Sequence, residues 1–304
     1  MPRSTTYPQP DRPTTVRWTA SLMATAIYAA EAVSRGLPLL DSPLDRTFLD
    51  AARSLRLWIG ERSSHAAFVW NHLGGLSADI ADPYALAGEV ATRMEPAAPT
   101  ANQIVELGEM LATLKHATRV AFPELVQELA VRVGPLRQQW EARGPGMMRE
   151  LLRLTHASIS PTQVEVLLVA PLLSGGGRAL FDYARCFFET VLVHPHPDLP
   201  EPVRLAWLIG QLGMDTPEQR DVIPAGRFPL VCQLALVPPV LLAAESVEWT
   251  VYRPDLIRRA LAAWHVPTLP NRPAHEWLIH WWQHVRQDRL PWNQALRELD
   301  EWLG

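Results

Sequence analysis

Hydrophobic residues recur at three- and four-residue intervals through the first half of the chain, which is the spacing of one face of an α-helix. In the segment 43–61, Leu44, Phe48, Leu55 and Ile59 fall on one such stripe. Capping residues, glycines and prolines predict further helices at Thr14–Arg35, from Ser63-Ser64 to Gly74-Gly75, from Asp82-Pro83, from Thr100 to Phe122, and from Pro123 to Gly144. The pattern therefore predicts an all-helical region at 14–143.

The pattern changes after Gly144-Pro145-Gly146. A short helix at 147–155 leads into Gln163–Val169, a β-branched and apolar run that predicts a strand. The run Cys186–Val193 predicts a second strand, which can pair side by side with the first. Later helices are expected at 202–212, 254–264, 274–287 and 293–303, and the apolar stretch 228–244, with Pro238 and Pro239, is either a buried core segment or two short helices.

These elements predict a mainly α fold with a small β element, of the α+β class. It comprises an N-terminal helical array, a helix–strand–strand–helix core and C-terminal helices. Residues 1–13 are rich in proline and small polar residues, which is typical of a flexible arm. The all-helical region 14–143 and the mixed region 144–304 are either two domains or one continuous domain.

Composition and charge narrow the class of protein. The chain has 304 residues, of which 48% are hydrophobic and 20% charged, so it can bury a substantial core. Its net charge is -4 and its basic residues are dispersed, whereas nucleic acid requires a concentrated positive patch. A single lysine, Lys115, among 28 basic residues is typical of a GC-rich bacterial genome. We therefore expect no nucleic-acid partner.

Cysteine usage and hydropathy bear on the location of the protein. Cys186 and Cys232 form no CxxC pair, which favours a reducing cytoplasm over a disulfide framework. The N-terminal residues carry charge and proline where an export signal needs an apolar run. The apolar stretch 228–244 is shorter than the ~20 residues of a spanning helix. These features predict a cytoplasmic protein with no membrane span.

Histidines and acids occur close together at several points, but in no complete metal-binding motif. His275 and Glu276 resemble the start of HExxH, yet the next histidine, His280, lies about 140° further around a helix than the first. His280 and His284 have metal-compatible spacing without an identifiable third ligand. Nucleotide-binding and nucleophile motifs are also missing from the sequence. We therefore predict no metal and no cofactor.

A candidate cleft lies around the second predicted strand. His194 and His196 alternate with prolines directly after it, and an extended backbone sends both imidazoles to the same side. If Glu189, Arg204 and Glu245 lie beside them, these five residues form a site for a small ligand or a reaction. The competing interpretation is a proline-stiffened loop with solvated histidines.

Two further features have both a functional and a structural interpretation. The glycine-rich segment Ser174–Arg178 could approach a phosphate, but a connection between two strands is the preferred interpretation. Tryptophan is concentrated in the last quarter of the chain, which holds seven of the twelve: Trp249, Trp264, Trp277, Trp281, Trp282, Trp292 and Trp302. An aromatic binding platform is conceivable, but large anchors that close a small helical core are commoner.

The segment from Arg143 to about Trp264 resembles a bacterial protein family of unknown function, through RGPGMMRELLRLT, VEVLLVAPLLSGGGR, FFETVLVHPHPDLPEPVRLAWLIGQL and LLAAESVEW. Its order of helix, strand, glycine loop, strand, helix and later acidic helix is also similar to the core of gluzincin metallopeptidases. In a gluzincin the helix after the second strand bears HExxH, whereas 202–212 contains neither histidine nor glutamate. Glu245 or Glu248 stands where a later glutamate ligand would lie. The resemblance therefore implies a catalytically silent relative without zinc.

The missing motifs lead to one main functional hypothesis. The chain is expected to be a non-catalytic cytoplasmic protein that acts through a protein or peptide partner. The alternative is an enzyme or small-ligand binder that uses the cleft near residues 189–204 and 245.

Overall fold

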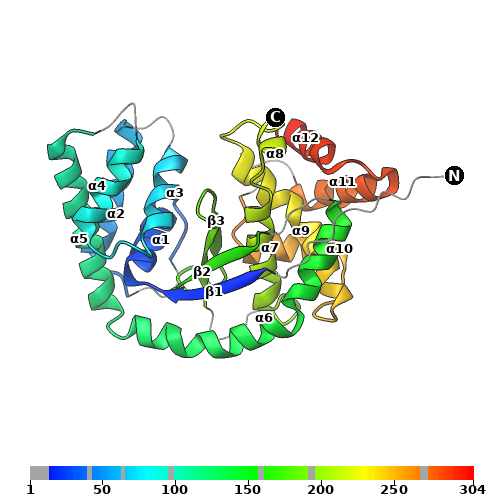
Figure 1. Ribbon diagram of the computed structural model, residues 1–304, viewed down its shortest axis with the longest axis horizontal. Coiled ribbons are helices and arrows are strands. Elements are labelled where there is room, and N and C mark those ends of the chain that lie inside the picture. Colours follow the sequence, from blue (N-terminus) through cyan, green and yellow to red (C-terminus); the bar gives the residue numbers. More distant parts are fainter. Residues whose placement is uncertain are drawn as a thin grey trace. The chain divides into compact units, whose positions relative to one another are not determined.

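The computed structural model describes residues 14–39, 43–62, 66–94, 99–156, 161–190, 196–267 and 273–304 (Figure 1). These residues form twelve helices and a sheet of four strands, which confirms the predicted mainly α fold with a small β element. The expected arm 1–13 and His194 lie outside the described residues.

The chain forms two compact units, each built from segments that lie far apart in the sequence. Unit 2 comprises Arg17–Pro135 and Glu165–Val193. Unit 1 comprises Leu136–Val164 and His194–Gly304 together with the residues up to Val16. The two units are therefore interleaved along the chain.

Unit 2 contains five helices that pack on one another: α1 (Leu22–Ser34), α2 (Arg46–Arg62), α3 (Ala66–Leu76), α4 (Pro83–Arg93) and α5 (Ala101–Ala121). Local capping explains where α4 and α5 begin. The Asp82 side chain accepts the N–H of Ala85, and Thr100 forms a capping box with Gln103. Both starts were predicted from these residues and are confirmed.

The first predicted helix was placed too early. Residues Thr15–Ala20 form strand β1, and α1 begins only after Ser21, whose side chain accepts the N–H of Ala24 at 3.2 Å. The strand contains β-branched residues and Trp18, which suit a half-buried strand better than a helix. Because pairing with a distant strand stabilises β1, the region 14–143 is not all helical.

The predicted helix break at Gly144 is also wrong. Helix α6 (Leu125–Thr155) runs through Gly144-Pro145-Gly146 for 31 residues. Its buried side chains recur every eleven residues, at Leu125, Leu136 and Met147 and again at Leu129, Trp140 and Leu151. An eleven-residue repeat keeps an apolar stripe on one face of the helix, so burial holds the helix together despite its prolines.

The sheet has the strand order β1-β2-β4-β3 and lies mostly in unit 2. Strand β2 (Gln163–Val169) has the predicted bounds, and it pairs in parallel with β4 (Arg185–Glu189). The second predicted strand is thus confirmed over 186–189, whereas 191–193 lie outside the described residues. Strand β3 (Gly177–Leu180) pairs antiparallel with β4 and was not predicted as a strand.

Two glycines of α3 allow the sheet to approach this helix closely. A Cβ atom at Gly75 would overlap the ring of Tyr183, and one at Gly74 would lie 2.8 Å from Leu180 Cδ2. The sequence predicts a helix end at these glycines, but α3 continues through them to Leu76. Their function in the fold is therefore to make room for the side chains of the β3–β4 hairpin.

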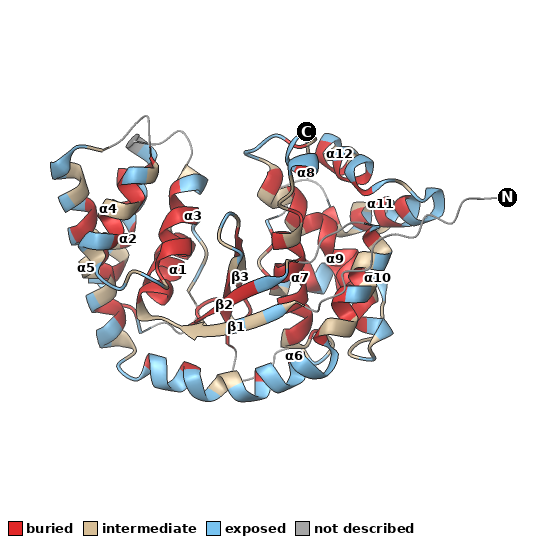
Figure 2. Cartoon of the chain, viewed as in Figure 1, coloured by how far each residue is buried: buried red, intermediate tan, exposed pale blue. Residues whose placement is uncertain are grey.

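Unit 1 is built around one apolar helix, α9 (Phe228–Ser246). Figure 2 shows it buried along most of its length, and it contacts four other helices of the unit. The remaining helices are α7 (Glu201–Gly213), α8 (Pro217–Arg220), α10 (Pro254–Ala263), α11 (Ala274–Asp288) and α12 (Trp292–Leu303). Of the two interpretations of this stretch, the single buried core segment is correct, with Pro238 and Pro239 inside the helix.

Helix α9 also bears on membrane association. Among the described residues it is the one helix that is long and apolar enough to cross a bilayer. Within its most apolar window, 72% of the residues are buried inside the fold, as in the core helix of a globular unit.

Replacing Gly75 with alanine should destabilise the protein by about 1–3 kcal/mol because the new methyl group collides with Tyr183. The matched control is Gly88→Ala in α4, where a Cβ atom meets no atom within 4 Å. That change should be neutral or stabilise by up to about 1 kcal/mol, since alanine is the better helix former. Chemical denaturation of both variants measures the difference, and equal effects would disprove the close-approach explanation.

Candidate functional site

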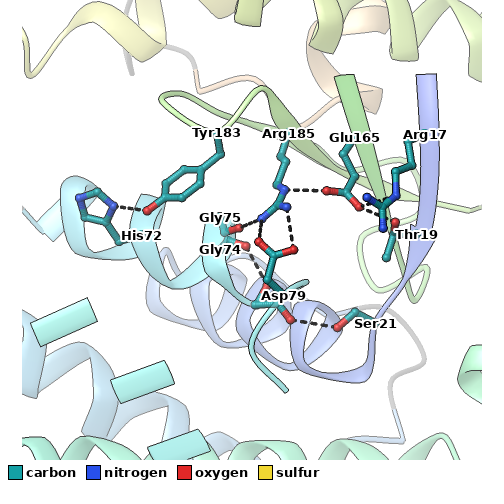
Figure 3. Close-up of polar contacts among 11 residues, drawn as sticks. Arg17, Thr19, Ser21, His72, Gly74, Gly75, Asp79, Glu165, Tyr183 and Arg185 are labelled. Atoms are coloured by element: carbon teal, nitrogen blue, oxygen red, sulfur yellow. Dashed lines mark hydrogen bonds and ion pairs between the residues drawn. The ribbon is translucent and has the colours of Figure 1, made fainter. Parts of the chain in front are cut away.

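A buried ion pair joins two neighbouring strands of unit 2. Arg185 of β4 and Glu165 of β2 are direct partners in the strand register, and Arg185 Nε lies 2.7 Å from Glu165 Oε2. Their side chains are only 13% and 11% exposed. Figure 3 shows Arg185 between Glu165 and Asp79, with which its two terminal nitrogens pair at 2.7 and 2.9 Å. Arg185 also donates to the carbonyl of Gly75.

The second oxygen of Glu165 extends this network to β1. Thr19 Oγ1 donates to Glu165 Oε1 at 2.6 Å, and Arg17 Nε lies 3.4 Å from the same oxygen. The network thus connects three strands with the end of α3 (Figure 3). Because both edges of the Arg185 guanidinium are already engaged, we interpret this cluster as a structural brace.

A second polar contact, between His72 and Tyr183, attaches the β3–β4 hairpin to α3 (Figure 3). His72 Nδ1 and Tyr183 Oη are 2.5 Å apart. Burial lowers the pKa of His72 from its usual 6.5; the Arg93 guanidinium also lowers it and Asp182 raises it. Burial likewise raises the pKa of Tyr183. Both groups are therefore neutral near pH 7, as a docking contact requires.

The glycine-rich loop binds a carboxylate of the same chain. Glu189 is fully buried, and its two oxygens accept four backbone N–H groups at 2.6–2.9 Å, those of Leu172, Leu173, Gly175 and Gly176. Arg178, at the end of the loop, pairs with Glu31 of α1. The amides that were considered as phosphate ligands thus hold an internal anion, and the loop connects β2 to β3.

The other residues of the predicted cleft belong to unit 1. Arg204 is buried, and its Nη2 lies 3.2 Å from Glu201 Oε1. Glu245 accepts the backbone N–H of Tyr252 at 2.9 Å, and the carbonyl of His196 accepts from Leu199. Since Glu189 lies in unit 2 and His194 is outside the described residues, the assembly of these five residues stays a prediction.

Two histidines of α11 lie close to carboxylates. His284 Nδ1 lies 3.2 Å from Asp288, and its Nε2 lies 3.6 Å from Glu298 of α12. His275 lies 3.9 Å from the adjacent Glu276. Within the part of the chain that the structure describes, no group of three or more His, Cys, Asp or Glu residues could hold a metal ion.

The C-terminal tryptophans close the core of unit 1. Trp281, Trp282 and Trp292 are buried and contact one another, and Trp281 Nε1 donates to the carbonyl of Ala295 at 3.0 Å. Trp277 is half-buried and stacks on Trp302 with ring centroids 4.1 Å apart. The pattern fits the core-anchor interpretation better than an open aromatic platform.

A hollow of about 420 Å³ lies between the C-terminal ends of α6 and α11 in unit 1. We call it the arginine hollow. Its lining residues are Arg153, Leu154, Thr155 and His156 from the end of α6, and Val285, Arg286, Arg289, Leu290 and Trp292 from the end of α11 and the start of α12. No acidic side chain is among these lining residues. The hollow therefore has a strongly positive lining.

The charges of the arginine hollow are only partly compensated. Arg153 pairs with Glu150 at 2.5 and 2.7 Å. For Arg286 and Arg289, no ion pair with a described residue is found. Both arginines are exposed. Two guanidinium groups beside one hollow suit an anion.

Sequence reasoning missed the arginine hollow. Arg286 and Arg289 look like ordinary basic residues in the last turn of a helix, where cations favour the helix dipole. Arg153 belongs to another helix far back in the sequence. The spacing of Arg286 and Arg289 was the available signal, and it does not reveal their distant neighbour.

No protein-family model, no curated protein and no solved structure matches this chain. The resemblances to a bacterial family and to gluzincins therefore stay predictions. Function has to be argued from the geometry of the described residues.

Replacing Arg185 with glutamine should lower the free energy of unfolding by about 3–5 kcal/mol, because Glu165 is left buried without its main partner. The control is Arg53→Gln, which removes an exposed pair with Asp50 and should cost less than about 1 kcal/mol. In a double-mutant cycle, Glu165→Gln combined with Arg185→Gln should lose clearly less than the two single changes together. Additive losses would show that the pair is not coupled.

The lowered pKa of His72 predicts a pH dependence of stability. Because the unfolded chain binds this proton more readily, the His72 contribution is complete above pH 6.5 and is lost as the pH falls below that value, down to the lowered folded pKa. Unfolding free energies should be measured between about pH 5 and pH 8. As the pH is lowered, they should decrease less steeply for His72→Gln than for the wild type. His116→Gln, an exposed change, should leave the profile unaltered. A wild-type profile in the His72 variant would contradict this assignment.

Proposed function

We propose that this chain is a non-catalytic binding protein, and that the arginine hollow of unit 1 holds an anionic group of a protein or peptide partner. The observation that carries the proposal is the uncompensated positive charge of the hollow, where Arg286 and Arg289 face no acid among the lining residues. The buried charges of the brace in unit 2 are paired within the chain, whereas Arg286 and Arg289 are exposed and accessible to a partner.

The state of the reactive side chains supports a non-catalytic function. Glu189 is held by four backbone amides, which occupy both of its carboxylate oxygens. Burial raises the pKa of Cys232 far above its usual range, so its thiol is a poor nucleophile. We therefore prefer binding over the alternative enzyme with a cleft near residues 189–204 and 245.

The proposal extends to location and ancestry. Both cysteines are buried thiols outside any disulfide, which suits a reducing cytoplasm. A catalytically silent relative of the gluzincin core is compatible with α7, which contains no histidine at the place where that family bears HExxH. The amino-acid usage favours a GC-rich bacterial source.

Isothermal titration with a short acidic peptide, in which leucines flank glutamates, tests the proposed function. The wild type should bind this peptide, and the same peptide with glutamines should bind at least tenfold more weakly because it brings no charge. The double variant Arg286→Gln with Arg289→Asn should also lose at least tenfold, with asparagine chosen because Arg289 has a φ of +51°. Raising the salt concentration should weaken binding further.

Arg297→Gln on α12 is the matched control, because Arg297 is an exposed arginine of the same unit outside the arginine hollow. It should bind like the wild type. Equal binding of the glutamate and glutamine peptides, or equal loss in the control, would refute the assignment of the hollow as the anion site.

A further inference from the structure

The arginine hollow offers hydrogen-bond donors in excess of what its helices need. Cations near the C-terminal ends of α6 and α11 stabilise those ends, because each helix carries about half a negative charge there. One cation at each end suffices for that. The lining includes three arginines, two of them at the end of α11, so the second arginine at that end requires another explanation.

We propose that the anion bound in the arginine hollow is a phosphomonoester attached to an apolar body; this inference rests on the proposed function and specifies its ligand. The charge of the hollow supports it. Glu150 compensates Arg153, which leaves Arg286 and Arg289 as two uncompensated charges. A phosphomonoester carries about −1.5 to −2 charges near pH 7, whereas a carboxylate carries one.

The number of donors points in the same direction. The arginines of the lining come from two helix ends, Arg153 from α6 and Arg286 and Arg289 from the last turn and C-cap of α11. One edge of the Arg153 guanidinium is engaged by Glu150. Arg286 and Arg289 each carry a planar set of N–H donors, and two such sets suit the three terminal oxygens of a phosphate better than the two of a carboxylate.

The shape and chemistry of the wall require more than a free phosphate ion. Leu154, Val285, Leu290 and Trp292 form an apolar part of the lining. A volume of about 420 Å³ falls in the range of pockets that enclose small organic ligands. An inorganic phosphate would leave this apolar wall in contact with water, whereas a ring or alkyl group bound to the phosphate would cover it.

Titration calorimetry at constant ionic strength, with phenyl phosphate, inorganic phosphate and benzoate as probes, tests this inference. Phenyl phosphate should bind about tenfold more tightly than either of the others, because it combines the doubly charged head with the ring. Its affinity should fall below about pH 6, where the phosphate gains its second proton. Benzoate should show no such fall in that range.

Single substitutions test whether phenyl phosphate binds in the arginine hollow. Arg286→Gln and Arg289→Asn should each weaken phenyl phosphate binding about tenfold, whereas Arg297→Gln should have no effect.

The outcomes separate this inference from the proposed function. If benzoate and the acidic peptide bind as tightly as phenyl phosphate, the inference of a phosphomonoester ligand is wrong, and the proposed anion-binding function stands. If inorganic phosphate binds as tightly as phenyl phosphate, the inference that the ligand carries an apolar group is wrong. If no anion binds, both proposals fail. A phosphotyrosyl peptide that binds more tightly than phenyl phosphate supports a phosphorylated peptide as the source, and equal affinities support a free phosphate ester.

Discussion

The packing of the strands and α3 in unit 2 depends on the ion pair between Arg185 and Glu165. Removing two charges from water costs several kcal/mol for each ion, and their attraction offsets this only when the remaining donors and acceptors are satisfied. Thr19, Asp79 and the carbonyl of Gly75 supply those partners from β1 and from the end of α3. The strands and the helix must therefore be in place together, which makes this part of the fold cooperative.

Buried charges in both units have partners within the chain, Arg204 of unit 1 with Glu201 included, whereas the arginine hollow leaves part of its positive charge uncompensated. In unit 2 the buried acids have internal partners, with Glu189 in a ring of backbone amides and Glu31 paired to Arg178. In unit 1 the exposed Arg286 and Arg289 line a hollow without an acid. Charges that are paired within the chain stabilise the fold, whereas an unpaired charge beside an apolar wall can bind a ligand.

The glycine-rich loop shows how a structural device can resemble a binding motif. Backbone amides that curve around one point bind an anion irrespective of its origin. Here the anion is the side chain of Glu189, so Gly175 and Gly176 allow the loop to close around a residue of the adjacent strand. A sequence pattern records the ability of such a loop to bind an anion, but not which anion it binds.

The sequence by itself determined the elements that depend on neighbouring residues. The caps at Asp82 and Thr100 and the strand Gln163–Val169 were predictable because a short segment contains their whole physical cause. Only the tertiary structure decided the strand pairing of β1, the continuity of α6 across Gly144 and the arginine hollow. Each of these depends on side chains that are far apart in sequence, and the energy of burial or of charge that decides them exists only once the chain has folded.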